Sequence, residues 1–303
     1  MNASSQTKID IFVPSETDAL QTVLMRLVAP MQLLKSLPAL LEPSIQRQMM
    51  HNRFAPYKLH RALAQQLAFK DTLEAHGAQV ILEPPIPYSG AHYTRDVGFA
   101  IDDTFFVARM GTRARQQEVV ALESWVARFS KVARLDAGTI EGGDVIIAPG
   151  RVLVGLGEAT NEAGVASFTA ALAEAGSARE VVPLRFNSRG VIHLDTKFNL
   201  VAPDLALISR HSFQQESLKW LEKHFQLIDA TPKETRAIHI NTFGLGNGTV
   251  VMDARAERLA SKLRNHGISP ILLDYSEITR LPGSFRCTTL PLKRRSGSAN
   301  GSR

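Results

Sequence analysis

A unit of β-hairpin, helix and strand recurs along this chain about every fifty residues, and this repeat most limits what the chain can fold into. Apolar runs that flank short Gly, Pro, Asn and Asp turns predict hairpins at 97–108, 145–154, 198–208 and 238–252. Each hairpin is followed by a segment with helical apolar spacing and then by a short strand. Residues 23–82 hold a fifth unit, strand–helix–strand. Repeats of this kind close on one another, so we expect an α/β fold in one array rather than two unrelated domains.

The predicted elements set the limits of this array. Helices are expected at 58–76, 116–130, 162–175, 212–224 and 256–266, and the strands that follow them at 79–82, 132–135, 181–184, 226–228 and 270–273. Residues 31–57, punctuated by prolines, are expected to hold helix and loop. We assign 1–19 as an N-terminal extension, 20–293 as a single domain and 294–303 as a disordered basic tail.

Composition and charge exclude several classes of protein. Hydrophobic residues make up 44% and charged residues 21%, which is ordinary for a chain with a core, and no apolar stretch is long enough to span a membrane. The first residues have no apolar signal core and the single cysteine fits a reducing compartment, so we expect a cytoplasmic protein that binds no membrane. The net charge is +6, but the basic residues are scattered, so no nucleic-acid partner is expected.

Three aspartates open hairpins at equivalent places in the repeat. Asp96, Asp144 and Asp195 lie 48 and 51 residues apart, each at the start of an apolar run. If the units are arranged around an axis, equivalent strand starts converge at its centre, and residues far apart in the sequence share one pocket. Each aspartate could instead only stabilise the turn or cap in which it lies, and Glu141-Gly142-Gly143-Asp144 could be only a tight turn. This alternative stays open.

Cys287 is the only cysteine, so it forms no intramolecular disulfide and builds no thiolate-rich zinc site. A free cysteine is often a small buried hydrophobe. Here Arg286 places a cation beside the sulfur, which is expected to lower the pKa of the thiol, and a histidine is the usual activating partner. His193, next to Asp195 at a repeat boundary, is the candidate. Other histidines lie near similar boundaries: His92, His211 and His239.

A pocket that gathers Cys287, His193 and the acids Asp96, Glu141 and Asp195 favours a cationic substrate. A protease triad carries one acid, whereas several carboxylates would surround this thiol. Such a site suits a planar guanidinium, which can form bidentate pairs with carboxylates. Attack of the thiolate on the central carbon of the guanidinium would then give a covalent intermediate.

Four motifs carry a resemblance to a known family and occur in that family's order. They are Thr94-Arg95-Asp96, Glu141-Gly142-Gly143-Asp144, His193-Leu194-Asp195-Thr196 and Arg286-Cys287-Thr288-Thr289-Leu290-Pro291-Leu292. With them the chain resembles the guanidino-group-modifying enzymes of the pentein superfamily: arginine deiminases, dimethylarginine dimethylaminohydrolases and amidinotransferases. The resemblance covers about residues 20 to 293. It implies a single pentein catalytic domain, which is an α/β propeller with a pseudo-fivefold repeat, and it implies no cofactor and no metal.

The resemblance also implies roles for single residues. Cys287 would be the nucleophile, His193 the general acid and base, and Glu141 the acid that pairs with the histidine or the guanidinium. Asp96 and Asp195 would hold guanidinium nitrogens. Arg115 is similar to an arginine that binds a substrate carboxylate in the family. Asp144 is expected to have a structural role in its turn.

These roles imply a hydrolase that acts on a C–N bond of a small guanidino substrate, of the arginine deiminase or dimethylarginine dimethylaminohydrolase type. An amidinotransferase and a non-catalytic pentein binding protein are the alternatives. Dimethylarginine hydrolases tend to have lysine in place of Asp195, so this motif is more similar to that of deiminases and amidinotransferases. The chain is too short for the extra helical domain of classical deiminases. It also carries Ala159 where arginine-acting members have a second carboxylate-binding arginine. The exact substrate and a homo-oligomeric state stay open.

Overall fold

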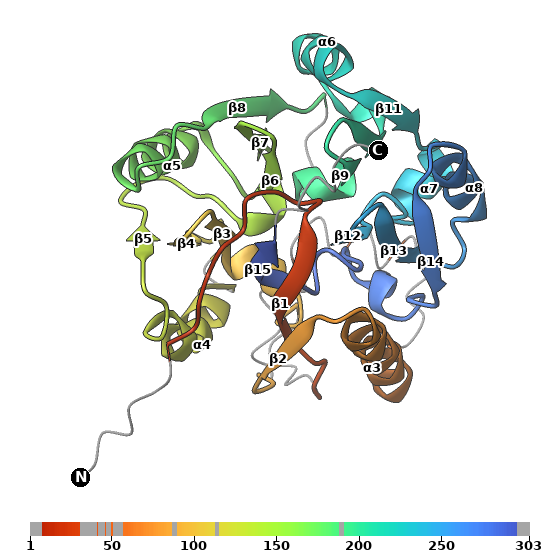
Figure 1. Ribbon diagram of the computed structural model, residues 1–303, viewed down its shortest axis with the longest axis horizontal. Coiled ribbons are helices and arrows are strands. Elements are labelled where there is room, and N and C mark those ends of the chain that lie inside the picture. The colour runs from red at the N-terminus through yellow and green to blue at the C-terminus, as the bar shows by residue number, and fades with distance from the viewer. Residues whose placement is uncertain are drawn as a thin grey trace, which may run out of the picture.

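Five three-stranded sheets surround a common centre in the computed structural model, with helices around the outside (Figure 1). The structure describes residues 8–30, 57–86, 90–112, 115–187 and 191–295, and the single positions 41, 46 and 50. The α/β propeller that the repeat and the family resemblance predict is therefore confirmed. Each sheet with its helix is one blade of this propeller.

The blade over residues 145–185 shows the unit most clearly. Its elements are β6 (Val145–Ala148), β7 (Arg151–Leu156), α5 (Glu162–Glu174) and β8 (Glu180–Arg185). Strands β6 and β7 form an antiparallel hairpin, and β8 returns parallel to β7 after the helix. The hairpin turn contains Gly150 with a φ of 69°, a left-handed conformation that glycine adopts without strain. The side chain of Asn161 caps α5 by accepting the backbone N–H of Gly164.

Three further blades repeat this order. Their elements are β3 (Gly98–Ile101), β4 (Thr104–Val107), α4 (Gln116–Val126) and β5 (Val132–Arg134); β9 (Phe198–Ala202), β10 (Leu205–Ile208), α6 (Gln215–His224) and β11 (Gln226–Asp229); and β12 (Phe243–Gly246), β13 (Thr249–Asp253), α8 (Glu257–Asn265) and β14 (Ser269–Leu273). A short helix, α7 (Pro232–Arg236), precedes β12. In each blade the first two strands are antiparallel, and the third is parallel to the second.

The fifth blade joins the two ends of the described chain. Its elements are β1 (Ala19–Arg26), α3 (Leu59–Ala75), β2 (Gln79–Glu83) and β15 (Leu290–Arg295). Strand β2 is parallel to β1, whereas β15 is antiparallel to it, with Leu24 opposite Leu290. The last strand thus supplies the hairpin strand that the fifth repeat lacked in the sequence, and the propeller closes.

Some segments differ from their predicted limits. In the predicted N-terminal extension, Ile11 and Val13 are buried in the core, and the backbone of Val13 pairs with Asp102. Strand β15 continues through Arg295, two residues beyond the predicted end of the domain. Most of 31–57, predicted as helix and loop, and residues 296–303 lie outside the described part of the chain.

Strand β12 begins at Phe243, later than the predicted start at 238. Residues 237–240 form a turn, in which Ile238 has a φ of 61°, a conformation that a β-branched residue rarely adopts. As a result Asn241 lies two residues before β12, in the same position that Asp96 occupies before β3.

Apolar side chains of the described residues pack into four core clusters, which join neighbouring blades. Phe99 of β3 stacks on Phe106 of β4, and Phe168 of α5 packs edge-on against both rings. All residues of β3, β4 and β6 are buried. Because close packing leaves little freedom, the starts of these inner strands are held firmly at the centre, where the candidate site lies. Among the described helices, none has the length and hydropathy that crossing a membrane requires.

Candidate active site

Five residues occupy equivalent positions in the five blades, and all five are buried. They are Asp96, Asp144, Asp195, Asn241 and Cys287, one to three residues before strands β3, β6, β9, β12 and β15. We call these five residues the central ring. The ring contains three of the predicted site residues and brings residues from the whole length of the described chain together.

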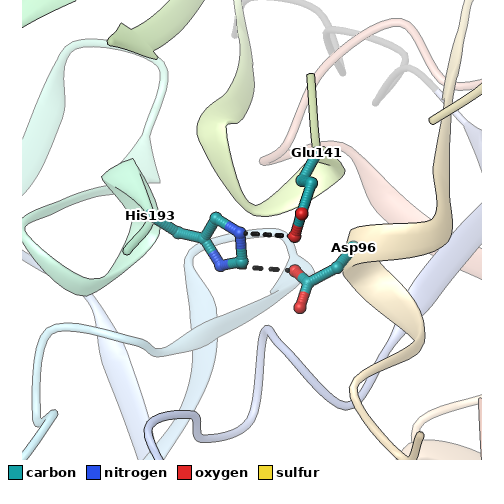
Figure 2. Close-up of side chains that lie close together, drawn as sticks. All are labelled: Asp96, Glu141 and His193. Carbon is teal, nitrogen blue, oxygen red and sulfur yellow. Dashed lines mark hydrogen bonds and ion pairs between the residues drawn. The ribbon is translucent and has the colours of Figure 1, made fainter. Parts of the chain in front are cut away.

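His193 contacts two of the predicted acids, Glu141 and Asp96, which lie on the same side of its ring (Figure 2). Its Nε2 atom is 3.0 Å from Oε2 of Glu141, and its Nδ1 atom is 3.5 Å from Oδ1 of Asp96. Each side chain comes from a different blade: His193 precedes β9, Glu141 precedes β6 and Asp96 precedes β3. The structure therefore joins three residues that the sequence grouped only by their place in the repeat.

The two carboxylates keep His193 protonated. Burial alone would lower the pKa of His193, but the charge of Asp96 and the hydrogen bond to Glu141 raise it to about 10. Burial raises the pKa of Asp96, although His193 and Arg115 oppose this effect. Glu141 keeps a lowered pKa despite its burial, because Arg115 and His193 stabilise its charge. At neutral pH the imidazole is thus a cation that can donate a proton.

Two glycines allow this close approach. A Cβ atom on Gly142 would lie 2.1 Å from the backbone oxygen of Arg95. A Cβ atom on Gly143 would lie 2.6 Å from the His193 ring and 2.7 Å from Oδ1 of Asp96. These distances are far below van der Waals contact, so the Gly-Gly pair is needed for the imidazole and Asp96 to meet.

Arg115 is fully engaged by carboxylates of the chain. Its Nη1 atom is 2.9 Å from Oδ2 of Asp96 and 3.0 Å from Oε2 of Glu141. Its Nε and Nη2 atoms donate to the two carboxylate oxygens of Glu118 at 3.1 and 2.8 Å. Burial alone would lower the pKa of Arg115, but these acids raise it well above its usual range. These partners are all carboxylates of the chain, and the role of Arg115 in binding a substrate carboxylate stays a prediction.

Cys287 lies in a tight turn before β15, close to Asp195. Its Sγ atom is 3.6 Å from Oδ2 and 3.9 Å from Oδ1 of Asp195, and its backbone N–H donates to Oδ1 of Asn241 at 3.2 Å. Burial and the charges of Asp195 and Asp96 raise the pKa of the thiol well above its usual range. No hydrogen bond joins Cys287 to His193 among the described residues. The two are related instead by Asp96, whose charge acts on both.

The prediction that Arg286 lowers the pKa of the Cys287 thiol is wrong in its net result. Arg286 does oppose the rise, but its guanidinium is turned to other acids: Nη1 donates to Asp195 at 2.9 Å and Nη2 to Glu16 at 2.7 Å. Nη2 also donates to the backbone oxygen of Val145 at 2.7 Å. Because the cation is already paired, burial and the nearby carboxylates dominate the pKa of the thiol.

Asp144 connects two blades. Its Oδ2 accepts the hydroxyl of Thr160 at 2.6 Å, and its Oδ1 accepts the backbone N–H of Leu194 at 2.9 Å. Burial raises its pKa to about 7. By holding Leu194, Asp144 fixes the backbone next to His193.

Sequence reasoning missed three polar residues of this region. Asn241 could have been found, because it lies 46 residues after Asp195 and 46 before Cys287 and so continues the repeat. Glu118 lies within the helix predicted at 116–130, and no motif there marks it as a site residue. Glu16 lies in the predicted extension, where no repeat marks it, although the structure buries it against Arg286.

Asp96, Glu141 and His193 also place three candidate metal-ligand atoms within 4.8 Å of one another. However, Arg115 lies against both carboxylates and His193 carries a raised pKa. Two cations therefore already balance these acids, and a protonated imidazole has no lone pair for a metal. The residues present do not fit a metal centre in this protonation state.

Comparison with known proteins gives the same family as the motifs. A family model described as arginine deiminase matches residues 31–227. The chain is similar to an uncharacterized protein, YkgA, of Bacillus subtilis, with 30% identity over 228 residues that cover 74% of this chain and 77% of that protein. It is also similar to the dimethylarginine dimethylaminohydrolase of Streptomyces coelicolor, with 27% identity over 77% of this chain and 86% of the relative. The solved structure of SxtG, an amidinotransferase of Microseira wollei, has a TM-score of 0.75 at 18% identity, over 94% of this chain and 98% of SxtG.

Proposed function

The chain belongs to the arginine deiminase family, and on this premise we propose that it hydrolyses a carbon–nitrogen bond of a small guanidino compound through a covalent intermediate on Cys287. The names of the family and of the Streptomyces coelicolor relative both denote enzymes that act on guanidino groups. The product would be a ureido compound together with ammonia or an amine.

One observation carries this proposal: the carboxylate of Asp96 acts electrostatically on both a buried thiol and a protonated imidazole. Its charge raises the pKa of both Cys287 and His193. Its Oδ1 atom is buried and makes no hydrogen bond among the described residues; it has an ion pair with Nδ1 of His193 at 3.5 Å, while Arg115 pairs with Oδ2. Because this buried oxygen lacks a full hydrogen bond, it could accept an N–H group of a bound guanidinium.

Binding of the substrate would also prepare the nucleophile. The thiol rests protonated and donates to Asp195. A guanidinium held by Asp96 and Asp195 would bring positive charge next to the sulfur and offset the carboxylates that raise its pKa. The thiol would then lose its proton to solvent when a substrate binds, and a thiolate is the reactive form of cysteine.

The first half-reaction forms a C–S bond and breaks a C–N bond. The thiolate of Cys287 attacks the central guanidinium carbon, and the leaving nitrogen takes a proton from the imidazolium of His193. Ammonia or an amine departs, which leaves an amidino group on the sulfur. In the structure, Glu141 and Asp96 hold the ring in place at 3.0 and 3.5 Å.

The second half-reaction returns the enzyme to its starting state. His193, now neutral, accepts a proton from water, and the resulting hydroxide attacks the amidino carbon. The C–S bond then breaks, the hydroxyl proton of the intermediate passes to the Cys287 sulfur, and the ureido product leaves. In an amidinotransferase an amine would take the place of this water.

The test is a product assay on a panel of guanidino compounds. Arginine, dimethylarginine, agmatine and guanidino acids are each incubated with the protein, with and without an added acceptor amine, and the ureido product is measured. We expect ureido product without an acceptor. Transfer to the amine with no hydrolysis would assign the chain to the amidinotransferases, and no conversion in either arm would contradict an enzyme of this class.

Acid quenching during turnover tests the covalent step. Mass spectrometry of the quenched protein should find an amidino adduct on the peptide that contains Cys287. In His193→Gln the adduct should form slowly, because no imidazolium is present to protonate the leaving nitrogen. An adduct that forms at the wild-type rate in this variant would remove His193 from the first half-reaction.

A further inference from the structure

Hydrogen bonds connect the blades along the central ring. Leu194 donates its backbone N–H to Asp144, and Arg95 donates its backbone N–H to the carbonyl oxygen of Cys287 at 3.1 Å. Between these two contacts, Asn241 forms two bonds with its side chain alone. Its Nδ2 donates to the backbone oxygen of Asp195 at 3.2 Å, and its Oδ1 accepts the backbone N–H of Cys287 at 3.2 Å.

We propose that Asn241 is a positioning residue that holds the Cys287 thiol at its place beside the Asp195 carboxylate. The catalytic role of the Cys287 thiol in this proposal rests on the proposed function, whereas the contacts of Asn241 involve no substrate. The amide is attached to the backbones of the two residues whose side chains meet at 3.6 Å. Any shift of this amide moves Sγ relative to Oδ2.

Only an asparagine-like amide fits both contacts. The donor faces a carbonyl oxygen and the acceptor faces an N–H, so rotating the amide by half a turn would place like groups against each other at both ends. Asn241 is buried, so water cannot replace either bond. A hydroxyl is too short to span the two backbones, and a carboxylate lacks the donor that the carbonyl of Asp195 requires.

A second buried asparagine keeps Asn241 in place. The Nδ2 atom of Asn199 donates to the backbone oxygens of Ile240 at 3.2 Å and Thr242 at 2.6 Å, which flank Asn241 in the sequence. The backbone on both sides of Asn241 is thus attached to β9 of the neighbouring blade. A residue that positions two side chains must itself be held rigidly, because a loosely held residue would let the two side chains move relative to each other. These two hydrogen bonds from Asn199 hold Asn241 in this way.

The experiment compares Asn241→Leu and Asn241→Asp with the wild type. Leucine has a similar shape but removes both bonds, whereas aspartate keeps the acceptor and loses the donor. Gln65→Met is the matched control, since Gln65 is a buried amide on α3 that accepts the backbone N–H of Glu277 at 2.9 Å away from the ring. For each folded variant we measure kcat, KM and the rate at which iodoacetamide alkylates the protein across pH.

Alkylation gives a direct reading of the site, because Cys287 is the only cysteine of the chain. The charged and titratable groups that face its sulfur are unchanged in Asn241→Leu and Gln65→Met: Asp195, Asp96, Arg286, Tyr93 and Tyr275. Asn241→Asp adds a carboxylate at position 241. A change in the alkylation profile of Asn241→Leu therefore reports a change in the position of the sulfur among them.

We expect kcat to fall by about 10²-fold in Asn241→Leu, because a misplacement near 1 Å has about this effect on a positioned reaction. KM should change by less than about threefold. The alkylation profile should move to lower pH as the sulfur leaves Asp195. In Asn241→Asp, kcat should also fall, whereas Gln65→Met should lose thermal stability and keep kcat and its alkylation profile.

Three outcomes would overturn the proposal. One is a folded Asn241→Leu with the wild-type kcat and alkylation profile. Another is a rise in KM alone, which would make Asn241 a ligand contact. The third is loss of the folded state in both Asn241 variants, which would make it a requirement of the fold. If the wild type converts no guanidino compound, the alkylation profiles still decide the role of Asn241, so failure of the proposed function is distinguishable.

Discussion

The Sγ atom of Cys287 lies 3.6 Å from Oδ2 of Asp195, so the thiol rests as a hydrogen-bond donor to a carboxylate. Burial and nearby negative charge raise the pKa of this thiol, which protects it from reaction in the absence of a ligand. In the reaction proposed above, the cationic substrate itself reverses this state. On this proposal, the thiol would become reactive only after a guanidinium enters the site.

Replacement of the nucleophile gives the simplest prediction. Cys287→Ser should lower turnover to a few per cent of the wild-type rate or less, because a hydroxyl is a far weaker nucleophile than a thiolate at neutral pH. The melting temperature checks that the variant is folded. Activity well above this level in a folded variant would rule out covalent catalysis by Cys287.

Asp195→Asn should change thiol reactivity and turnover in opposite directions. Loss of the negative charge lowers the pKa of Cys287, so alkylation at pH 8 without a ligand should become faster, by about tenfold for each unit that the pKa falls. Turnover should fall, because the guanidinium loses one of its two carboxylates. Unchanged or slower alkylation in this variant would show that Asp195 does not control the thiol.

His193 should make the fold less stable at alkaline pH. Its pKa is raised to about 10 in the folded protein, above the ordinary value near 6.5, so its stabilising effect is complete below about pH 6.5 and is lost as the pH rises toward about 10. The effect is on the order of a few kcal/mol. Urea unfolding at pH 6 and pH 10 should show a smaller loss of stability in His193→Gln than in the wild type. Both are measured with Cys287→Ser as background, because the thiol also titrates at alkaline pH.

Removal of Arg115 should destabilise the protein strongly. Arg115→Met leaves Asp96, Glu118 and Glu141 buried without their shared cation, and breaking a buried ion pair costs about 3–5 kcal/mol. Arg134→Met is the control, since its pair with Glu123 is exposed and should contribute less than about 1 kcal/mol. Equal losses in urea unfolding would contradict the ion-pair argument.

Methyl groups on the guanidinium should lower activity. Asp96 and Asp195 would each accept an N–H donor, and each such charged hydrogen bond contributes about 1.5–3 kcal/mol. Dimethylation of one nitrogen removes donors, so kcat/KM should be at least about tenfold higher for arginine than for asymmetric dimethylarginine, because 1.4 kcal/mol corresponds to a factor of ten. A clear preference for dimethylarginine would place the chain functionally with the dimethylarginine hydrolases.

The sequence predicts the blades well, because hairpins, helices and third strands each have a local signal. Apolar runs flank Pro149-Gly150, and Asn161 marks the start of α5, where the structure has a turn and a helix cap. The equivalent aspartates were visible from their spacing alone. Closure of the propeller was less visible, because β15 pairs with β1 from the other end of the described chain, and no local pattern reveals such a partner.

The electrostatics of the site could not be read from the sequence. Arg286 is adjacent to Cys287 in the chain, yet its guanidinium pairs with Glu16 and Asp195. The choice among histidines also required coordinates. His239, near a similar repeat boundary, has no hydrogen-bond partner for either ring nitrogen among the described residues, whereas His193 contacts two carboxylates. Such pairings depend on which side chains converge in space.

The pairing of β15 with β1 sets the order in which the protein can mature during synthesis. Four blades, from β3 to β14, can form from residues that leave the ribosome before Cys287 does. One edge of β1 stays unpaired until β15 has been synthesised, and pairing between segments so far apart in the sequence forms slowly. Cys287 directly precedes β15, so the thiol is seated only when this last pairing forms. A growing chain therefore acquires most of its blades first and the final position of Cys287 last.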